Sequence, residues 1–371
     1  MRIATNLRIV TKRTSAAVLA ALTVATTLIG CSSSGRSTGG MSADGASAGG
    51  ASAHGWAAGQ LSIRASGLAS ALDLVPDMPG GYAMYTDWSM LGHQDRNGAD
   101  TASFAGELLA DDDQLQRDLG IRSTYAQWEL DVTRAGRPPL VVLGFGRHTD
   151  LSGLAARLTR LGYHADGSIF TGPASYSPGR IWAIALRSIG IDSRRHLLVG
   201  GRDTAAVRSV LAGPAHPLGH ASAVIPLLAL ASARLGRITT ASTTVGSAAC
   251  VRLTALLGMH ATPEAVAVLR KRLPGRFTPP QAEITALASP TAKTALDAMT
   301  FPDHGTARAN QRSRLAASKV LTGLALANPA EVRVTSTAVT GRVLRFKLTA
   351  RQPRDFRQLV LYNDLGVDIC P

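Results

Sequence analysis

The feature that most constrains folding is the composition of the first 60 residues, which cannot build a domain. Residues 1–30 carry four cations and no acid, and their last half is an apolar run from Ala16 to Ile29. Residues 31–60 are nearly all Ser, Gly and Ala, without periodic apolar positions. Such a segment buries too little apolar surface to offset the entropy lost on ordering it. We therefore expect the folded body to lie within residues 61–371.

The N-terminal segment has the pattern of an export signal. A charged stretch precedes a short apolar stretch, which is too short for a comfortable transmembrane span. The apolar run ends in Leu28-Ile29-Gly30-Cys31, and this sequence resembles the lipobox of bacterial lipoproteins. The resemblance implies cleavage between Gly30 and Cys31 and attachment of diacylglycerol to the Cys31 thiol. An ordinary secretory signal with a chance cysteine, or an uncleaved anchor, remains the alternative.

These patterns divide the chain into four segments. We expect a lipoprotein signal peptide over residues 1–30 and a disordered Gly/Ser/Ala tether over residues 31–60. A tether of this length has a root-mean-square reach of about 30 Å. The body then divides into a first half, residues 61–215, and a second half, residues 216–371. Whether the two halves are true repeats stays open.

Hydrophobic periodicity predicts an α+β body, with antiparallel or mixed sheets and helices packed on one face. Alternating or continuous apolar runs predict strands over residues 81–88, 125–132, 140–145, 168–171, 181–189, 196–199, 238–245, 282–288, 294–301, 332–339 and 343–349. Helical spacing and capping residues predict helices over residues 61–73, 104–119, 151–161, 203–211, 223–235, 263–273, 304–318 and 355–362. The order lacks the strict strand–helix alternation of a doubly wound nucleotide-binding fold.

The three cysteines suggest one covalent cross-link. If Cys31 carries the lipid, Cys250 and Cys370 remain as an even pair in an oxidising compartment, and we expect them to be bonded. Two separate buried thiols are the alternative. The order of lipobox, tether, Val75-Pro76-Asp77, the segment before Cys250 and the terminal Asp-Ile-Cys is also similar to uncharacterised actinobacterial lipoproteins. That resemblance implies a location and the same cysteine pairing, but no activity.

The charge balance bears on partners. Removing the four leader cations from the net charge of +14 leaves +10 on the mature chain. An exported protein has little access to nucleic acid, so we expect anionic lipid headgroups or cell-wall polymers as counter-charges instead. The densest basic clusters are Arg270, Lys271 and Arg272, and Arg308, Arg312 and Arg314. They form either an anion-facing patch or an ordinary solvated surface, in which the first cluster stabilises a helix C-terminus.

Searches for catalytic signatures return nothing that predicts a reaction. Gly-x-Ser-x-Gly occurs twice, at residues 35–39 and 45–49, but within the Gly/Ser/Ala segment and without the strand–turn–helix context that a nucleophilic serine needs. The chain lacks His-Glu-x-x-His, Cys-x-x-Cys and a P-loop. We therefore predict no catalytic residue, no metal site and no cofactor. A triad assembled from distant residues stays open, and its conceivable members are His148, Asp150, His164, Asp192, His196, Asp303 and His304.

The sequence thus favours a lipid-anchored, extracytoplasmic protein at the cell membrane, with a non-enzymatic body that binds an envelope protein, a lipid or a cell-wall polymer. A cell-envelope hydrolase with a dispersed catalytic site is one alternative. A carrier for an apolar ligand is the other.

The lipid anchor can be tested directly. We expect metabolic labelling with a fatty-acid analogue to mark the wild-type protein and not the Cys31→Ala variant, because only a thiol accepts the diacylglyceryl group. Cys250→Ala is the matched control and should label like the wild type. Equal labelling of wild type and Cys31→Ala would exclude this anchor.

Overall fold

The computed structural model describes residues 67–91, 112–134, 136–173, 181–252, 262–273, 275, 277–289, 291–323, 332–352, 356 and 369–370. All of them belong to one structural unit, Ile63–Pro371. The predicted signal peptide and tether, with Gly30 and Cys31, lie outside the described residues. In the described part of the chain, no helix is both long and apolar enough to cross a membrane.

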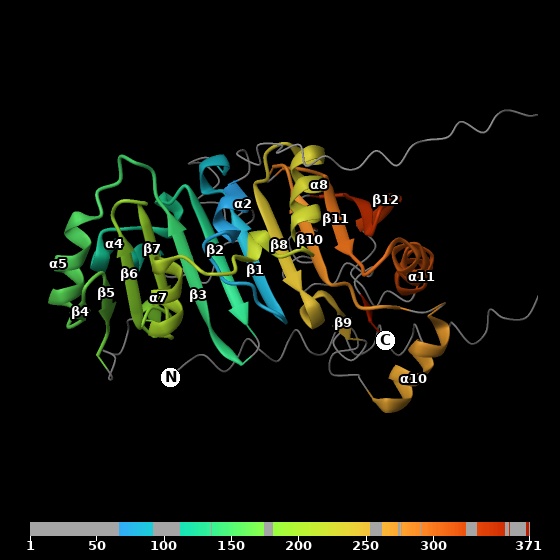
Figure 1. Ribbon diagram of the computed structural model, residues 1–371, viewed down its shortest axis with the longest axis horizontal. Helices are drawn as coiled ribbons and strands as arrows, with labels where there is room; N and C mark the ends of the chain where they lie inside the picture. The colour runs from blue at the N-terminus through green and yellow to red at the C-terminus, as the bar shows by residue number, and fades with distance from the viewer. Residues whose placement is uncertain are drawn as a thin grey trace, which may run out of the picture. The chain divides into compact units, whose positions relative to one another are not determined.

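The body is built around one open sheet of twelve strands (Figure 1), ordered β12-β13-β11-β10-β8-β1-β2-β3-β7-β6-β5-β4. All its neighbouring strands are antiparallel. The strands are β1 Gly81–Thr86, β2 Trp128–Arg134, β3 Arg137–Gly144, β4 His164–Asp166, β5 Ile169–Thr171, β6 Ser188–Asp192, β7 Leu197–Gly201, β8 Thr240–Val245, β10 Ala282–Leu287, β11 Thr294–Thr300, β12 Val332–Thr340 and β13 Val343–Ala350. A second, parallel pair joins β9 Val251–Arg252 to β14 Ile369–Cys370. The predicted α+β class is confirmed.

The two halves of the chain repeat one strand order. Outward from the centre, the first half runs β1-β2-β3-β7-β6 and the second runs β8-β10-β11-β13-β12. Each half has a helix before its first strand, α2 Gly67–Leu72 and α8 Ile225–Leu235. Each also has a helix after its third strand, α5 Ser152–Arg160 and α11 His304–Gly323. The halves therefore share a topology, although both contribute to a single sheet.

Individual backbone bonds follow the same repeat. The Phe145 N–H donates to the carbonyl oxygen of His196, and the Phe301 N–H donates to that of Arg342. Each of these bonds prolongs the pairing of a third strand with the strand beyond it. Because both occur at the same place in the repeated order, the repeat extends to backbone contacts at this position.

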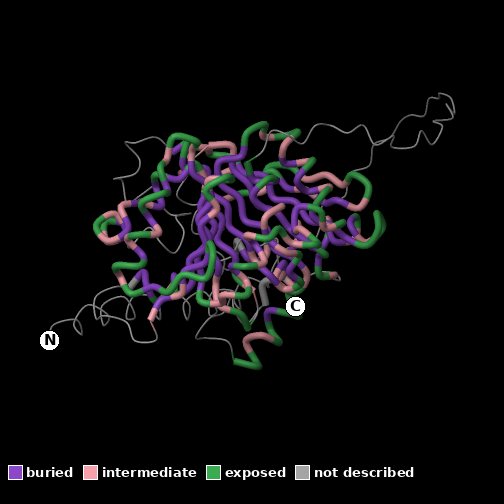
Figure 2. Tube along the Cα trace, turned by 60° about the vertical axis from the view of Figure 1, so that its left-hand side comes forward, coloured by how far each residue is buried: buried purple, intermediate pink, exposed green. Residues whose placement is uncertain are grey.

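Helices cover both faces of the sheet, whereas the sequence indicated one. Val141 and Val142 on β3 point to opposite faces, and both are buried. Val142 packs in a core with α2, α7 Thr204–Ala212 and α8, while Val141 packs in another with α4 Asp112–Leu119, α5 and α6 Ile181–Ala185. A strand that is apolar on both sides needs cover on both sides. Figure 2 shows the strands as the buried interior, with exposed residues on the helices and loops.

Capping side chains mark two helix starts, the first of which, Asp203, was predicted. The Asp203 carboxylate accepts hydrogen bonds from the N–H groups of Ala205 and Ala206 at the start of α7. Thr262 accepts one from Ala265 at the start of α10 Pro263–Arg272. These side chains satisfy backbone donors that the first helical turn leaves unpaired.

The predicted strand over residues 181–189 is wrong in its first part. Residues Ile181–Ala185 form helix α6, and strand β6 begins only at Ser188. Trp182 and Leu186 are both fully buried, and the Leu186 N–H donates to the carbonyl oxygen of Trp182. That spacing of four is helical, but a short apolar run does not distinguish a helix from a strand by its period. The short strand β4 was also not predicted.

Two substitutions in α6 test this correction. Trp182 is fully buried and its indole N–H donates to the Asp118 carboxylate at 3.0 Å, whereas Ile184 is 46% exposed. We expect Trp182→Ala to lower the free energy of unfolding by about 3–5 kcal/mol. Ile184→Ala, the matched control, should change it by no more than roughly 0.5 kcal/mol. Urea denaturation measures both, and similar losses would indicate that residues 181–185 form a strand instead.

Candidate functional site

The centre of the sheet carries a buried polar surface on the face that holds α5 and α11. A row of directly paired residues crosses it in the order Val141, Asp131, Met84, Ser242, Thr285, Asp297 and Phe346. Its two ends are apolar and its middle is polar. Glu129 and Glu283 lie on the same face by strand alternation. We name the four acids Glu129, Asp131, Glu283 and Asp297 the central acidic set, and all four are buried.

In the first half, aromatic residues lie beside the acids. The Trp88 indole N–H donates to the Glu129 carboxylate at 2.8 Å, and both side chains are buried. Trp88 stands in a single 3-10 turn, Trp88–Met90, directly after β1. Burial, and then the charge of Asp131, raises the pKa of the Tyr82 hydroxyl well above its usual value. This hydroxyl stays protonated and donates to the Met84 sulfur at 3.4 Å.

In the second half, a buried arginine accompanies the acids. Burial raises the pKa of Asp297 from 3.8 to about 7, although hydrogen bonds from Glu283 and Thr285 and the Arg314 charge all favour the ionised form. The Thr285 hydroxyl donates to Asp297 at 3.4 Å. Arg314 on α11 is fully buried and lies over the rings of Phe277 and Phe301. The carboxyl pair Glu283–Asp297 therefore holds a proton under mildly acidic conditions.

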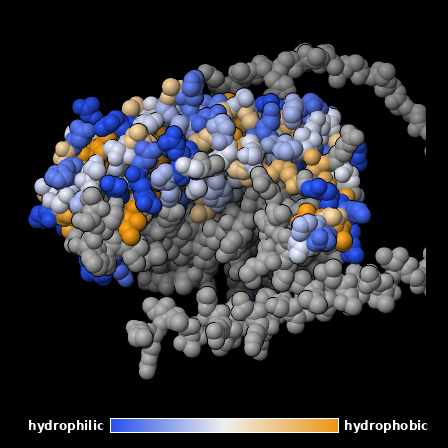
Figure 3. Space-filling model, turned by 90° about the horizontal axis from the view of Figure 1, so that it is seen from below, coloured by the Kyte–Doolittle hydropathy of each residue, from blue (hydrophilic) through white to orange (hydrophobic). Residues whose placement is uncertain are grey.

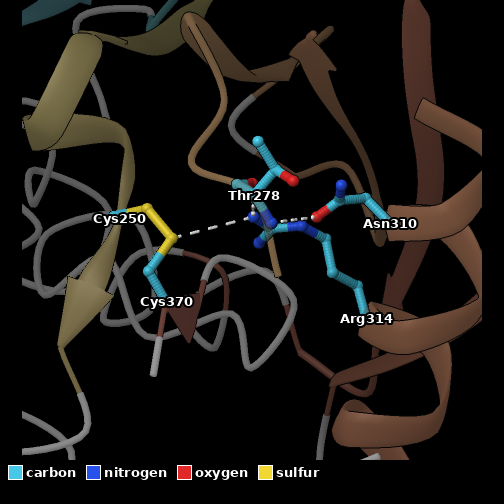
Figure 4. Close-up of a disulfide and its surroundings, with 5 residues drawn as sticks. All are labelled: Cys250, Thr278, Asn310, Arg314 and Cys370. Atoms are coloured by element: carbon cyan, nitrogen blue, oxygen red, sulfur yellow. Dashed lines mark hydrogen bonds between the residues drawn. A yellow bond between two sulfur atoms is a disulfide. The ribbon is translucent and has the colours of Figure 1, made fainter. Parts of the chain in front are cut away.

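The disulfide lies beside this arginine (Figure 4). Cys250 and Cys370 are bonded, with their Cα atoms 5.4 Å apart. This confirms the predicted pair and excludes two separate thiols. The Arg314 guanidinium lies 3.8 Å from the Cys370 sulfur and donates to the Thr278 carbonyl oxygen at 3.1 Å. The bond closes a loop with a sequence separation of 120. Closing a loop of this length contributes roughly 4–5 kcal/mol in the chain-entropy model.

The predicted anion patch divides between two helices. Arg270, Lys271 and Arg272 form the last turn of α10, and Arg308 and Arg312 lie on α11. All five are exposed, and none has an ion-pair partner within the described residues. Arg314 does not belong to such a surface, because it is buried. Helix α10 packs through Leu269 on Ala317 of α11, which lies about 13 Å along the helix axis beyond Arg308.

Four of the seven conceivable triad members, Asp150, Asp192, Asp303 and His304, have other partners. Asp150 accepts from the Ser152 N–H before α5, and Asp192 pairs with Arg195 at 2.6 Å. Asp303 accepts from Thr306 in the first turn of α11, and the His304 ring nitrogen lies 2.7 Å from the Gly341 carbonyl oxygen. In the parts of the chain that the structure describes, no three His, Cys, Asp or Glu side chains are grouped to hold a metal ion.

Sequence reasoning missed the central acidic set. Its signal was present: Glu129 and Asp131 alternate with Leu130 and Val132, which predicts one apolar and one polar face. A solvated polar face is the ordinary meaning of that pattern, and only the three-dimensional structure shows that this face is covered. A run of acids such as residues 111–113 would ordinarily form a solvated helix start. Instead, Asp112 is buried and accepts hydrogen bonds from the Ser123 and Thr124 hydroxyls.

The acids of the second half are buried together. The carboxyl groups of Glu283 and Asp297 interact with each other and have almost no contact with solvent. The chain has no significant match among family models, among curated proteins or among solved structures.

The Glu283–Asp297 pair makes stability depend on pH. Because the folded-state pKa of Asp297 is about 7 and its ordinary value is 3.8, the folded chain binds more protons than the unfolded chain between these values. The Glu283–Asp297 pair therefore stabilises the folded state fully below pH 3.8, and this stabilisation is lost as the pH rises through about 7. We expect Asp297→Asn to flatten this dependence, measured by urea denaturation between about pH 4.5 and about pH 8.

Asp303→Asn is the control for this measurement. Hydrogen bonds from Thr306 lower the pKa of the exposed Asp303 carboxyl. This group therefore stays ionised across the range tested, and its loss should weaken the helix cap equally at every pH. An unchanged slope in Asp297→Asn would show that Asp297 is not the titrating group.

Proposed function

We propose that this protein is a lipid-anchored, extracytoplasmic binding protein of the cell envelope and not an enzyme. Acyl chains on Cys31 would hold it to the outer face of the cytoplasmic membrane, and the segment after Cys31 would give the body freedom to reorient. Its partner would be an envelope protein, a lipid or a cell-wall polymer. Two or more acyl chains give stable anchoring, since a single chain binds only marginally.

The observation that carries this proposal is the Cys250–Cys370 disulfide. Structural disulfides persist in oxidising compartments and are rare in the cytosol. This bond therefore supports export, which is also what the N-terminal signal pattern predicts. With Cys31 acylated, the mature chain would have no free thiol, because it contains three cysteines.

Two features favour binding over catalysis. The polar groups that resemble catalytic machinery, the central acidic set with Arg314, are buried and engaged in the interior. The surface, in contrast, mixes hydrophilic and hydrophobic residues over the described part seen from below (Figure 3). Such a surface fits contacts with a polar or charged partner better than uptake of an apolar ligand.

Covalent probes and crosslinking test the proposal together. We expect serine- and cysteine-directed probes to leave the native full chain unlabelled, while the reduced and unfolded chain labels at Cys250 and Cys370 as the positive control. Chemical crosslinking of intact cells should give a defined adduct with the wild type. This adduct should be lost with Cys31→Ala, which no longer stays at the membrane. Probe labelling of one residue in the native chain would instead favour a hydrolase.

A further inference from the structure

One end of the sheet is a long strand with an open edge. Strand β12 has nine residues, Val332–Thr340, and pairs with β13 on one side. Among the described residues, no strand and no backbone group is hydrogen-bonded to its other side. Its outer row of N–H and C=O groups is therefore a template for another strand.

The repeated topology shows what occupies this position in the first half. There the strand equivalent to β12 is β6, and β5 is hydrogen-bonded to its outer edge in antiparallel pairing, with Phe170 opposite Ile189. Strand β4 then follows β5. The second half has no described counterpart of this hairpin, so an added antiparallel strand is the occupant that the fold itself specifies.

The surface beside this edge is basic. Residues 332–350 include four Arg or Lys residues and no acid. Arg345 and Lys347 alternate on β13, and Arg333 on β12 is opposite Thr349, so all three lie on the face opposite Phe346 and α11. Arg333 and Lys347 are exposed. The Nε of Arg345 is buried and has no hydrogen-bond partner. We name Arg333, Arg345, Lys347 and the outer edge of β12 the basic edge surface.

The charge of this surface distinguishes between the molecules that could pair with the edge of β12. A second copy of this chain, paired edge to edge, would bring its own basic surface next to this one, which is unfavourable. A phosphate or uronate polymer matches the charge but does not use the row of backbone groups. An acidic polypeptide in extended conformation satisfies both, because main-chain bonds give affinity and alternate side chains give specificity.

We propose that β12 accepts an acidic, extended segment of another envelope protein as an added antiparallel strand, whose carboxylates face Arg333, Arg345 and Lys347. This rests on the proposed binding function and specifies its partner. Every second side chain of the partner would face the basic surface, and its intervening residues would point to the α11 side, where Val334 and Val339 lie.

A peptide-binding experiment on the full chain in detergent tests this proposal. The probe is a fluorescent nine-residue peptide that alternates glutamate with valine, and its anisotropy is followed at low salt. We expect it to bind, and we expect its lysine counterpart not to bind. Arg333→Glu combined with Lys347→Glu should weaken binding by roughly tenfold or more. Arg270→Glu combined with Lys271→Glu makes the same charge change on the exposed last turn of α10. In a repeat of the measurement at about 0.15 M salt, where distant charges are screened, this variant should leave the affinity within about twofold.

Backbone-modified peptides separate strand addition from charge alone. Two versions of the glutamate peptide, N-methylated at odd or at even positions, keep every charge but lose alternate N–H donors. We expect one of them to lose binding, because only one set of donors faces β12. Equal binding of both would overturn the proposal in favour of an anionic polymer. Concentration-dependent self-association abolished by Arg333→Glu would overturn it in favour of a second copy.

A negative result in the peptide experiment can be distinguished from failure of the proposed binding function. If no peptide binds while intact cells still give the crosslinked adduct, the binding function stands and the basic edge surface is not its site. If neither signal appears, both proposals are wrong.

Discussion

The antiparallel pairing of β1 with β8 is the constraint on which the rest of the body depends. These strands are the only direct sheet contact between the two halves within the described residues, and Met84 is directly opposite Ser242. A shift of one residue in this register would move Ala83 and Tyr85 out of the α8-side core and bring Met84 into it. The register of this pair therefore determines, for every strand further out, which side chains point toward α2 and α8 and which point toward α5 and α11.

That constraint explains why polar groups occupy the centre. On the α11 side, the strands closest to the β1–β8 junction carry acids and hydroxyls beside apolar residues such as Met84 and Met299, and the row of paired residues ends at Val141 in one direction and at Phe346 in the other. Burying carboxylates is unfavourable unless they are bonded or protonated. The two halves solve this differently: Trp88 donates to Glu129, whereas Asp297 shares a site with Glu283 near the Arg314 charge. The second solution also binds α11 to the sheet, and the same arginine contacts the Cys370 sulfur and so reaches the C-terminal disulfide.

Much of the fold was predictable because local rules agree with the final structure. The predicted strands 282–288 and 294–301 correspond to β10 and β11, and Asp203 begins α7 as its capping chemistry predicts. The error at residues 181–189 arose where Trp182 and Leu186 sit in a run without clear period. The order of strands depends on long-range pairing, which no local pattern encodes. The acids were missed for a related reason, since alternation at Glu129 identifies a polar face but not what lies above it.

The two ends of the sheet differ in a way that stability alone does not explain. Proteins limit edge-to-edge association with very short edge strands, and β4 follows this rule with three exposed residues. Strand β12 has nine residues and departs from it, although its pairing with β13 shifts register between Val334 and Ser336. The equivalent strand β6 is protected by an inserted hairpin, so the same architecture had a means to close this edge. Within the described residues, this edge is uncovered in one of two equivalent positions, and the proposed partner strand accounts for that difference.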